Sequence, residues 1–390
     1  MKNYKVLPKS AENIEGNTSI NSSVFIEQNN FPEQDSEFGW KAEQSISVVI
    51  PNYNGKHLLE ANLPTVMKAL KYINIKKKPL SPFKNNTDFS FEIIVVDDAS
   101  NDKSVEFIQQ NYPEIILLIN EHNKGFSTTI NKGIFIAKHE LILVLNSDVQ
   151  LTENYFIEQL KYFKRKDTFG VMSKIIDPPN RGKSNTAIHK VQDGAKYPKT
   201  SFRGIKTTYN YLPTNESLEN WLPSFFLSGA NALINKEKLI QLGGFDEIYS
   251  PYYYEDADLG IRAWSVGWKC YFEPKSICMH TPSSTISKLK SEKVKLIIER
   301  NRIIFNNIHL RGWQLHFFNC WLWLRCIIKL IKGNSTIYKA ILLFRENKYR
   351  IKKSKEKLLQ LCEKTKKYYS VYDTEKYILK KIKKIKYRIF

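Results

Sequence analysis

The feature that most constrains the fold is a regular alternation of short apolar runs with helix-like stretches between residues 46 and 148. The apolar runs are rich in Val, Ile and Leu and end in polar or turn-forming residues, which is typical of buried strands. The predicted strands lie within 46–55, 91–100, 114–120 and 140–148, and the predicted helices are 56–73, 101–111 (capped by Asn101) and 125–138. This alternation predicts an α/β fold with a mostly parallel, doubly wound sheet.

Polar side chains follow three of these predicted strands. Pro51-Asn52-Tyr53-Asn54 ends the first strand, Asp97-Asp98 the second, and Asn146-Ser147-Asp148 the fourth. Ligands of such sheets bind beyond the carboxyl ends of the strands, so we expect the three segments to face one crevice. Two alternatives stay open at this point. Asp97-Asp98 also suits a helix cap, and Asn146-Ser147-Asp148 suits either a simple turn or a site for Mg²⁺ or Mn²⁺.

A second group of acids lies in YYYEDADLGIRAW, residues 252–264. Three tyrosines precede Glu255, Asp256 and Asp258, and apolar residues at helical spacing follow them. A helix is therefore predicted to begin near Glu255, where Asp258 suits the positive end of the helix dipole as a structural residue. Glu255 and Asp256 remain as candidates for acid–base chemistry.

Length and composition allow one large domain with an appendage, or two domains, in the 390 residues. Residues 1–44 lack the apolar stretch of a secretory signal and are predicted to form a weakly ordered extension. We place the main domain at 45–285, with a long loop at 177–194, and a helical, basic region at 286–390.

The five cysteines include no CxxC pair. They indicate a reducing compartment, with neither a disulfide framework nor a structural zinc site.

The positive charge is concentrated near the C-terminus. Residues 329–390 contain 20 Lys and Arg against 5 Asp and Glu, in a chain of net charge +21. Such a tail predicts an anionic partner, either a membrane surface or nucleic acid. The basic residues are not interleaved through an RNA-binding motif, so we expect no nucleic acid.

An apolar stretch of nearly membrane-spanning length, residues 313–333, precedes this basic tail. Gln314, Arg325, Lys329 and Lys332 fall near one face of the predicted helix. These charges disfavour a full span and favour a helix that lies in the plane of an anionic membrane surface. The alternative is a helical bundle packed on the main domain.

The motifs together resemble a known family. ISVVIPNYNG, IIVVDDASND, NKGFSTTINKG, LVLNSDV, LSGANALI, GGFDE and YYYEDADLGIRAW occur in the order seen in family 2 glycosyltransferases. These are inverting enzymes with the GT-A fold, and the resemblance covers about residues 45–285. It is closest to bacterial rhamnosyl- and galactofuranosyltransferase-like members.

The resemblance implies a role for each matching residue. Pro51, Tyr53, Asn54, Asp97, Asp98, Lys124, Gly125, Asn146 and Ser147 are expected on the donor nucleotide side, and Ser228, Gly229, Ala230 and Tyr254 on the acceptor side. Asp148 and His280 are the implied metal ligands, Asp256 the implied catalytic base, and Glu255 the alternative base. Two positions depart from the family pattern. Asn146 replaces the first acid of the D-x-D motif. Ile130 stands where the family often has Arg, which leaves Lys124 as a candidate for that basic contact.

The implied reaction is the transfer of one sugar, with inversion, from a nucleotide-sugar to an acceptor hydroxyl. The resemblance implies a UDP- or dTDP-linked donor, Mn²⁺ or Mg²⁺ as cofactor, and a glycan or lipid-linked glycan acceptor in bacterial surface polysaccharide synthesis. We expect the enzyme at the cytoplasmic face of the membrane, bound peripherally. A nucleotidyltransferase is the alternative, but PNYNG is a poor match to the Gly-rich basic loop of that class. The Q-x-x-R-W motif of processive synthases does not occur.

Overall fold

The structure is a computed structural model that describes residues 45–77, 89–178, 191–213, 221–280, 291–384 and 387–389. The predicted extension 1–44 and most of the predicted loop 177–194 lie outside the described residues.

A parallel half-sheet forms the first part of the fold, as predicted. β1 (Ile46–Asn52) pairs in parallel with β2 (Phe91–Asp97) and β4 (Leu141–Leu145), and β2 pairs with β3 (Ile116–Ile119). The connecting helices are α1 (Lys56–Lys77), α2 (Ser104–Asn111) and α3 (Phe126–Ile136). The N-cap of α2 is Lys103, so the predicted cap at Asn101 is wrong.

Beyond β4 the sheet becomes mixed. β11 (Asn231–Asn235) runs antiparallel to both β4 and β6 (Thr168–Ile176), and β12 (Lys269–His280) runs parallel to β6. Among the described residues this gives a ten-stranded sheet. Eight strands follow the path β10-β12-β6-β11-β4-β1-β2-β3, and the other two, β5 and β7, pair with β12 and β6. The remaining short elements are β5 (Val149–Leu151), β7 (Val191–Asp193), β10 (Leu222–Pro223), α4 (Lys236–Gln241), α5 (Glu255–Ser265), and the 3-10 helices η1 (Leu160–Lys164) and η2 (Glu247–Tyr249).

Alternation along the buried strands separates two apolar layers. Val48 and Ile50 of β1 belong to the cluster that includes α1, whereas Val49 belongs to the cluster that includes α3. This follows from the period of two in a strand, which sends successive side chains to opposite faces. Gly133 of α3 allows close packing on the sheet, because an added Cβ there would lie 2.3 Å from Val49 Cγ1.

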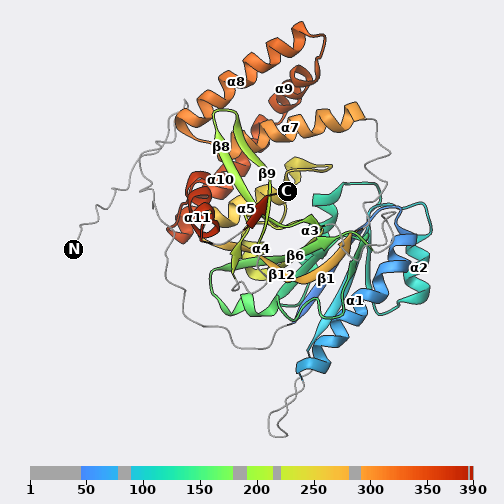
Figure 1. Cartoon of the computed structure of the whole chain (residues 1–390). Helices are drawn as coiled ribbons and strands as arrows, with labels where there is room; N and C mark the ends of the chain where they lie inside the picture. The colour runs from blue at the N-terminus through green and yellow to red at the C-terminus, as the bar shows by residue number, and fades with distance from the viewer. Residues whose placement is uncertain are drawn as a thin grey trace, which may run out of the picture.

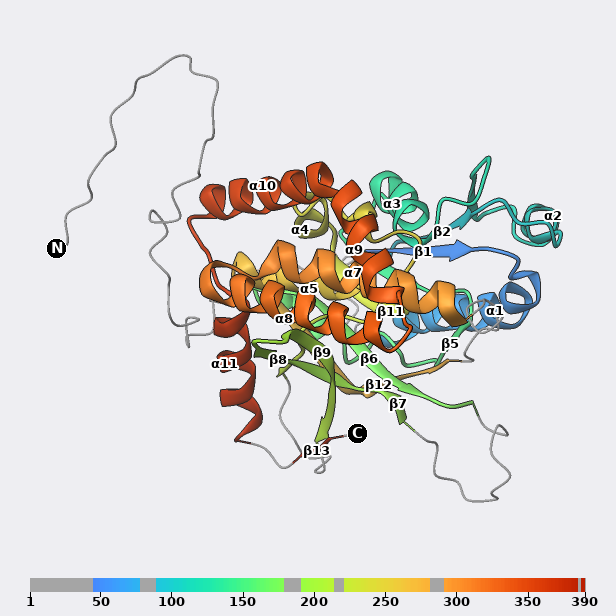
Figure 2. The same cartoon turned by 90° about the horizontal axis from the view of Figure 1, so that it is seen from above.

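The C-terminal region is helical, as predicted. It contains α7 (Ser291–His309), α8 (Gly312–Ile331), α9 (Thr336–Glu346), α10 (Lys348–Thr365), α11 (Val371–Ile382) and the short strand β13 (Tyr387–Ile389). These elements gather on one side of the sheet, with α8 and α9 outermost (Figures 1 and 2).

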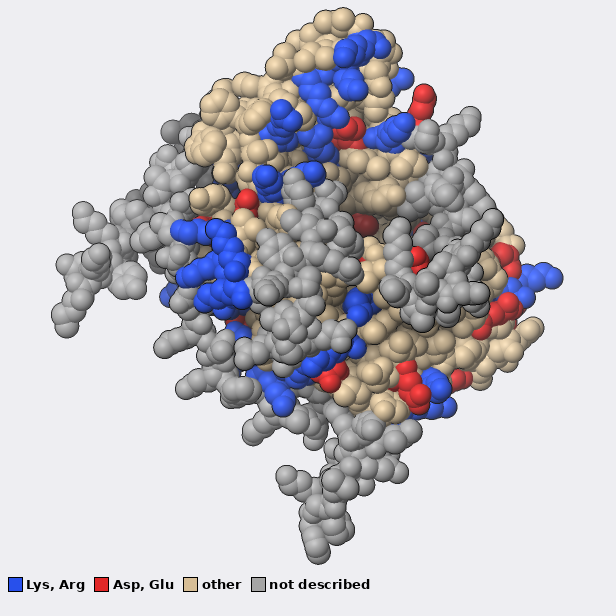
Figure 3. Space-filling view, in the orientation of Figure 1, with Lys and Arg blue, Asp and Glu red and all other residues tan. Residues whose placement is uncertain are grey.

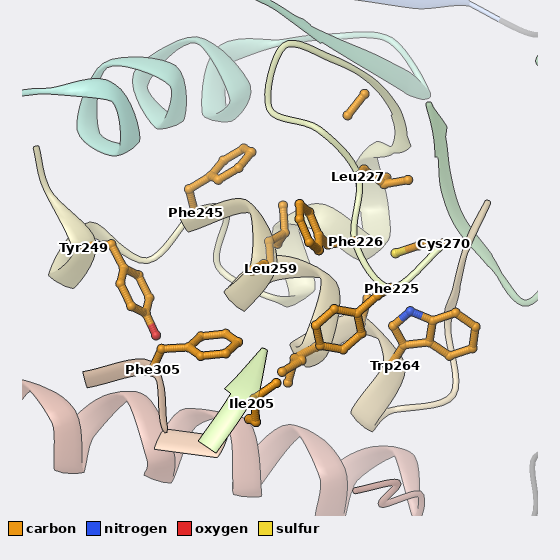
Figure 4. Close-up of a cluster of buried hydrophobic side chains, with 14 of the residues drawn as sticks. Ile205, Phe225, Phe226, Leu227, Phe245, Tyr249, Leu259, Trp264, Cys270 and Phe305 are labelled. Atoms are coloured by element: carbon orange, nitrogen blue, oxygen red, sulfur yellow. The ribbon is translucent and has the colours of Figure 1, made fainter. Parts of the chain in front are cut away.

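The C-terminal helices share a core with the main domain. Phe305 of α7 belongs to the same buried cluster as Trp264 of α5 and Ile205 (Figure 4). The hairpin of β8 (Ala195–Ser201) and β9 (Gly204–Pro213) contributes to this core, and β13 pairs with β9. The alternative predicted for 313–333, a helix packed on the main domain, holds for the inner side of α8, whose Phe318, Leu322 and Cys326 belong to the same cluster.

A buried polar cluster fixes α5 against α7. The carboxylate of Asp258 accepts hydrogen bonds from Arg262 Nε at 2.6 Å and the Tyr249 hydroxyl at 3.0 Å, and it lies 2.8 Å from His309 Nε2. Burial alone would raise the pKa of Asp258, but Arg262 and His309 lower it to about 2. Asp258 is thus a structural residue near the start of α5, as predicted.

Replacing Asp258 by Asn should destabilise the fold by about 3 kcal/mol, because it leaves Arg262 buried without its carboxylate. The free energy of unfolding from urea denaturation measures this loss. The pKa of Asp258 lies below its ordinary value of 3.8, so the stability it confers is present above that value and is lost as the pH falls towards about 2. The gap between wild type and Asp258→Asn should therefore narrow over that pH interval.

The control is Glu356→Gln, at an acid that forms only an exposed pair with Lys352 at 3.9 Å. Its effect should stay within about 0.5 kcal/mol. Equal losses in the two variants would contradict the role given to Asp258.

Candidate active site

A cleft of about 630 Å³ opens where the carboxyl ends of β1, β2 and β4 meet the start of α5. This is the edge of the sheet at which the sequence placed the crevice. Most of the predicted site residues line it: Pro51, Tyr53, Asp98, Gly125, Asn146, Ser147, Asp148, Ser228, Gly229, Ala230, Glu255 and Asp256. The structure thus brings together segments that lie up to about 200 positions apart in the chain.

Asp97 and Asn54 hold loops together and do not line the cleft. Asp97 is fully buried, and its carboxylate accepts hydrogen bonds from Asn52 Nδ2 at 2.9 Å and the Ser100 hydroxyl at 2.6 Å. Asn54 Oδ1 accepts from the backbone N–H of Asn101 at 2.7 Å. This geometry does not support the predicted contacts of Asp97 and Asn54 with a nucleotide.

Asp98 lines the cleft and shapes the loop before α3. Its two carboxylate oxygens accept the backbone N–H groups of Lys124 at 2.9 Å and Gly125 at 3.0 Å. The Lys124 side chain does not line the cleft, whereas Lys293 of α7 does. The basic residue at the cleft wall therefore comes from α7, and the prediction for Lys124 is not supported.

The segment Asn146-Ser147-Asp148 is held from two sides. Asn62 of α1 donates to the Ser147 carbonyl at 2.7 Å, and the Asn146 N–H donates to the Ala230 carbonyl at 3.1 Å. These bonds place the Asp148 carboxylate 3.2 Å from His280 Nε2. The predicted pair of metal ligands therefore meets in space, although His280 itself does not line the cleft.

His280 is oriented by Gln192, which sequence reasoning missed. Gln192 Nε2 donates to the His280 carbonyl at 2.9 Å, so its Oε1 is left to accept from His280 Nδ1 at 3.1 Å. His280 Nε2 then faces Asp148 Oδ1, a buried oxygen with no hydrogen-bond partner among the described residues. A ring nitrogen and a carboxylate oxygen at this distance fit a cation between them. Imidazole is a common ligand of transition metals, and carboxylate suits Mn²⁺. No third His, Cys, Asp or Glu joins them within the described ranges.

Glu255 and Asp256 line the same cleft as Asp148, at the first residues of α5. Asp256 Oδ1 accepts the N–H of Ala257 at 2.7 Å, and Glu255 Oε2 is buried with no hydrogen-bond partner among the described residues. Burial raises the pKa of both carboxyls, and the charge of Asp256 raises the pKa of Glu255 further. Lys196 of β8 opposes the rise for Asp256, so this carboxyl ionises first.

The three tyrosines before α5 separate into two groups. Tyr252 and Tyr253 line the cleft. Tyr254 turns away and packs on Phe305, with ring centroids 5.1 Å apart. This geometry does not support its predicted place on the acceptor side.

Sequence reasoning also missed the cleft residues that come from α7, Lys293 and Ile297. They lie more than 35 positions after Asp256, in the region predicted to be a helical, basic extension. No local motif marks them, because their place depends on how α7 folds back over the start of α5.

Comparison with known proteins agrees with this geometry. The model of the family described as glycosyl transferase family 2 matches residues 47–243. An N-acetylglucosaminyl-diphospho-decaprenol L-rhamnosyltransferase of Mycobacterium tuberculosis is 23% identical over 249 residues, which are 58% of this chain and 78% of that protein. A poly-β-1,6-N-acetyl-D-glucosamine synthase of Staphylococcus aureus is 22% identical over 65% of this chain, but over only 53% of its own length.

Among solved structures, GalNAc-T7 with UDP, GalNAc and Mn²⁺ matches 88% of this chain and 57% of its own, with 16% identity and a TM-score of 0.58. At that identity the match supports the GT-A fold alone. The family model, which covers half of the chain, shows that this protein belongs to glycosyl transferase family 2.

Proposed function

We propose that this protein transfers a single sugar from a nucleoside diphosphate sugar to a hydroxyl of a glycan or lipid-linked glycan, with inversion. The observation that carries the proposal is that Glu255 and Asp256 line one cleft together with Asp148, which has His280 beside it. The rhamnosyltransferase relative, whose name includes a decaprenol-linked sugar, supports the choice of acceptor. A UDP- or dTDP-linked donor and a role in bacterial surface polysaccharide synthesis complete the proposal.

Asp256 acts as the base. Its carboxylate removes the proton of the acceptor hydroxyl as the oxygen attacks the anomeric carbon opposite the leaving diphosphate. Glu255, whose pKa is raised to about 8, keeps its proton at neutral pH and is therefore the poorer base. Asp258 is excluded, because its carboxylate is occupied by Arg262, Tyr249 and His309.

Asp148 and His280 would hold a divalent cation, Mn²⁺ or Mg²⁺, which when bound neutralises charge on the leaving diphosphate. Gln192 keeps the His280 lone pair directed at that position. Tyr53 and Asp98 lie on the same side of the cleft, where the nucleotide would bind.

The outer surface of α8 supports a peripheral membrane location. Its exposed residues are mostly apolar and recur at helical spacing, among them Trp313 (68% exposed), Phe317, Leu324, Ile327 and Ile331 (81%), while His316 and Cys320 are exposed as well. Arg325 turns inward and pairs with Glu299 of α7 at 2.6 Å. No helix among the described residues is long and apolar enough to cross a membrane.

Basic side chains surround this apolar surface. Lys332, Lys339 and Lys348 are exposed on α8, α9 and α10, and Arg345 stacks on Trp323 at 5.6 Å. Figure 3 shows Lys and Arg gathered over the part of the molecule where α8 and α9 lie. Apolar insertion flanked by positive charge fits an anionic lipid bilayer. We therefore place the enzyme peripherally on the cytoplasmic face, where a lipid-linked acceptor would be held.

Replacing Asp256 by Asn should lower kcat by about 10²-fold or more, because the acceptor proton loses its base. A screen of nucleotide-sugars for released nucleoside diphosphate identifies the donor and measures the rate. In the wild type, kcat/KM should fall as the pH drops below about 6, the raised pKa of Asp256. Glu255→Gln is the matched comparison, and we expect it to retain more activity than Asp256→Asn. Full activity in Asp256→Asn would refute the assignment, and release of pyrophosphate would indicate a nucleotidyltransferase instead.

Replacing Asp148 by Ala should abolish the part of UDP binding that depends on Mn²⁺, as measured by calorimetry with and without the ion. Gln192→Leu should weaken Mn²⁺ affinity by about 10-fold or more, because His280 loses the partner that orients it. Glu153→Gln, at an acid outside the cleft paired with Lys68, should change neither. Unchanged Mn²⁺ dependence in Asp148→Ala would contradict the metal site.

Replacing Leu324 and Ile327 together by Glu should weaken binding to vesicles that contain anionic lipid by about 10-fold or more, since each buried side chain contributes roughly 1.5–3 kcal/mol. Co-sedimentation at low salt measures the binding. Phe135→Glu is the control, because Phe135 is equally exposed but lies on α3. If the double variant still binds the vesicles as the wild type does, α8 does not lie on the membrane surface.

A further inference from the structure

The loop that leads into the catalytic carboxylates is held from outside the region matched by the family model. This loop, residues 249–254, joins η2 to α5 and ends directly before Glu255. We call it the tyrosine loop. Tyr253 (φ 74°) and Tyr254 (φ 79°) both adopt left-handed backbone conformations. Bulky residues seldom do so, and such conformations persist only where surrounding contacts enforce them.

Asn301 of α7 supplies those contacts. Its Nδ2 donates to the carbonyls of Tyr249 at 2.7 Å, Tyr252 at 2.9 Å and Tyr253 at 2.9 Å. The residue is fully buried. The amide of one side chain therefore binds three carbonyls of the loop. If this donor were lost, the three carbonyls would lack this hydrogen-bond partner.

Arg300 fixes the orientation of that amide. Its Nε donates to Asn301 Oδ1 at 2.9 Å, which leaves Asn301 Nδ2 directed at the loop, and its Nη2 donates to the Ser250 carbonyl. Arg300 and Asn301 together bond four backbone carbonyls in the loop.

The same loop touches the donor half of the cleft. The Pro251 carbonyl accepts the N–H of Phe126 at 3.3 Å. At Gly125 an added Cβ would lie 3.0 Å from Pro251 Cα. The position of the loop thus sets the spacing between the donor loop on one side and Glu255-Asp256 on the other.

We propose that Asn301, oriented by Arg300, is a positioning residue that holds the loop 249–254 so that Asp256 faces the acceptor hydroxyl. The proposal rests on the proposed function of Asp256 as the base. It makes α7 part of the active site, because the same helix also lines the cleft with Lys293 and Ile297.

Asn306 provides a matched control on the same helix. It is also fully buried, but its Oδ1 accepts from Ile205 N at 2.7 Å and its Nδ2 donates to the Arg302 carbonyl. It therefore supports the turn between β8 and β9 and makes no bond to the tyrosine loop. If only the loss of a buried amide mattered, kcat should fall equally in the Asn301 and Asn306 variants. If Asn301 positions the base, kcat should fall much further in the Asn301 variant.

The experiment compares Asn301→Asp with Asn306→Asp in the full-length protein. Asn301→Asp replaces the donating amide by a carboxylate oxygen, which repels the three loop carbonyls instead of binding them. The loop should therefore no longer be held in place. For Asn301→Asp we expect kcat to fall by about 10²-fold, the cost of a misplaced catalytic group. KM for the donor found in the nucleotide-sugar screen should change by less than about threefold, because the residues on the nucleotide side are untouched. For Asn306→Asp, kcat should stay within about threefold of wild type.

Amide hydrogen exchange gives a readout that does not depend on turnover. Exchange in 249–256 should accelerate by about tenfold or more in Asn301→Asp, and in Asn306→Asp any acceleration should be confined to residues near 205. Arg300→Met, at a half-exposed position, should shift kcat and exchange in the same direction but less. It also serves as the test if Asn301→Asp does not fold.

Equal kcat values in Asn301→Asp and Asn306→Asp, or unchanged exchange in 249–256, would overturn the proposal. If the wild type transfers no sugar from any nucleotide-sugar tested, the proposed function fails. In that case hydrogen exchange alone decides whether Asn301 holds the loop.

Discussion

The carboxylate of Asp258 joins the two parts of the molecule on which the rest of the site depends. It binds Arg262 within α5, Tyr249 at the start of the tyrosine loop and His309 at the end of α7. A buried carboxylate is tolerated only when its charge and its hydrogen-bonding capacity are satisfied. The C-terminal helices therefore cannot separate from α5 without exposing a buried ion pair, and the direction of α5 determines where Glu255 and Asp256 point.

Three acids within four residues illustrate how environment assigns chemistry to one residue type. Asp258 has its pKa lowered by Arg262 and His309, whereas burial raises the pKa of Glu255 and Asp256. Asp258 is thereby permanently charged and stabilises the structure. The other two titrate in the range where proton transfer is useful. Lys196, from a hairpin distant in sequence, favours ionisation of Asp256 over Glu255.

The C-terminal region serves both the cleft and the outer surface. α7 lines the cleft and holds the tyrosine loop, and α8 packs on it through Phe318, Leu322 and the Arg325–Glu299 pair. Arg325 of α8 is satisfied on the inner side by Glu299, and the exposed side of the helix is mostly apolar. One side of such a helix packs on the protein, and the other side can contact a lipid bilayer.

The sequence by itself determined the parallel half-sheet and the edge at which the site lies. Strand periodicity is local, and parallel strands bring their carboxyl ends together, so Asp98 and Asp148 were predictable members of one cleft. Asp256 was expected there only from the resemblance to family 2 glycosyltransferases. Only the tertiary structure decided which neighbours turn away, as Asp97 and Tyr254 do, and that Gln192, Lys293 and Asn301 take part. Burial and hydrogen-bond partners arise from segments far apart in the chain, as between Asn301 and the carbonyls about fifty positions before it. No local pattern of residues encodes such a contact.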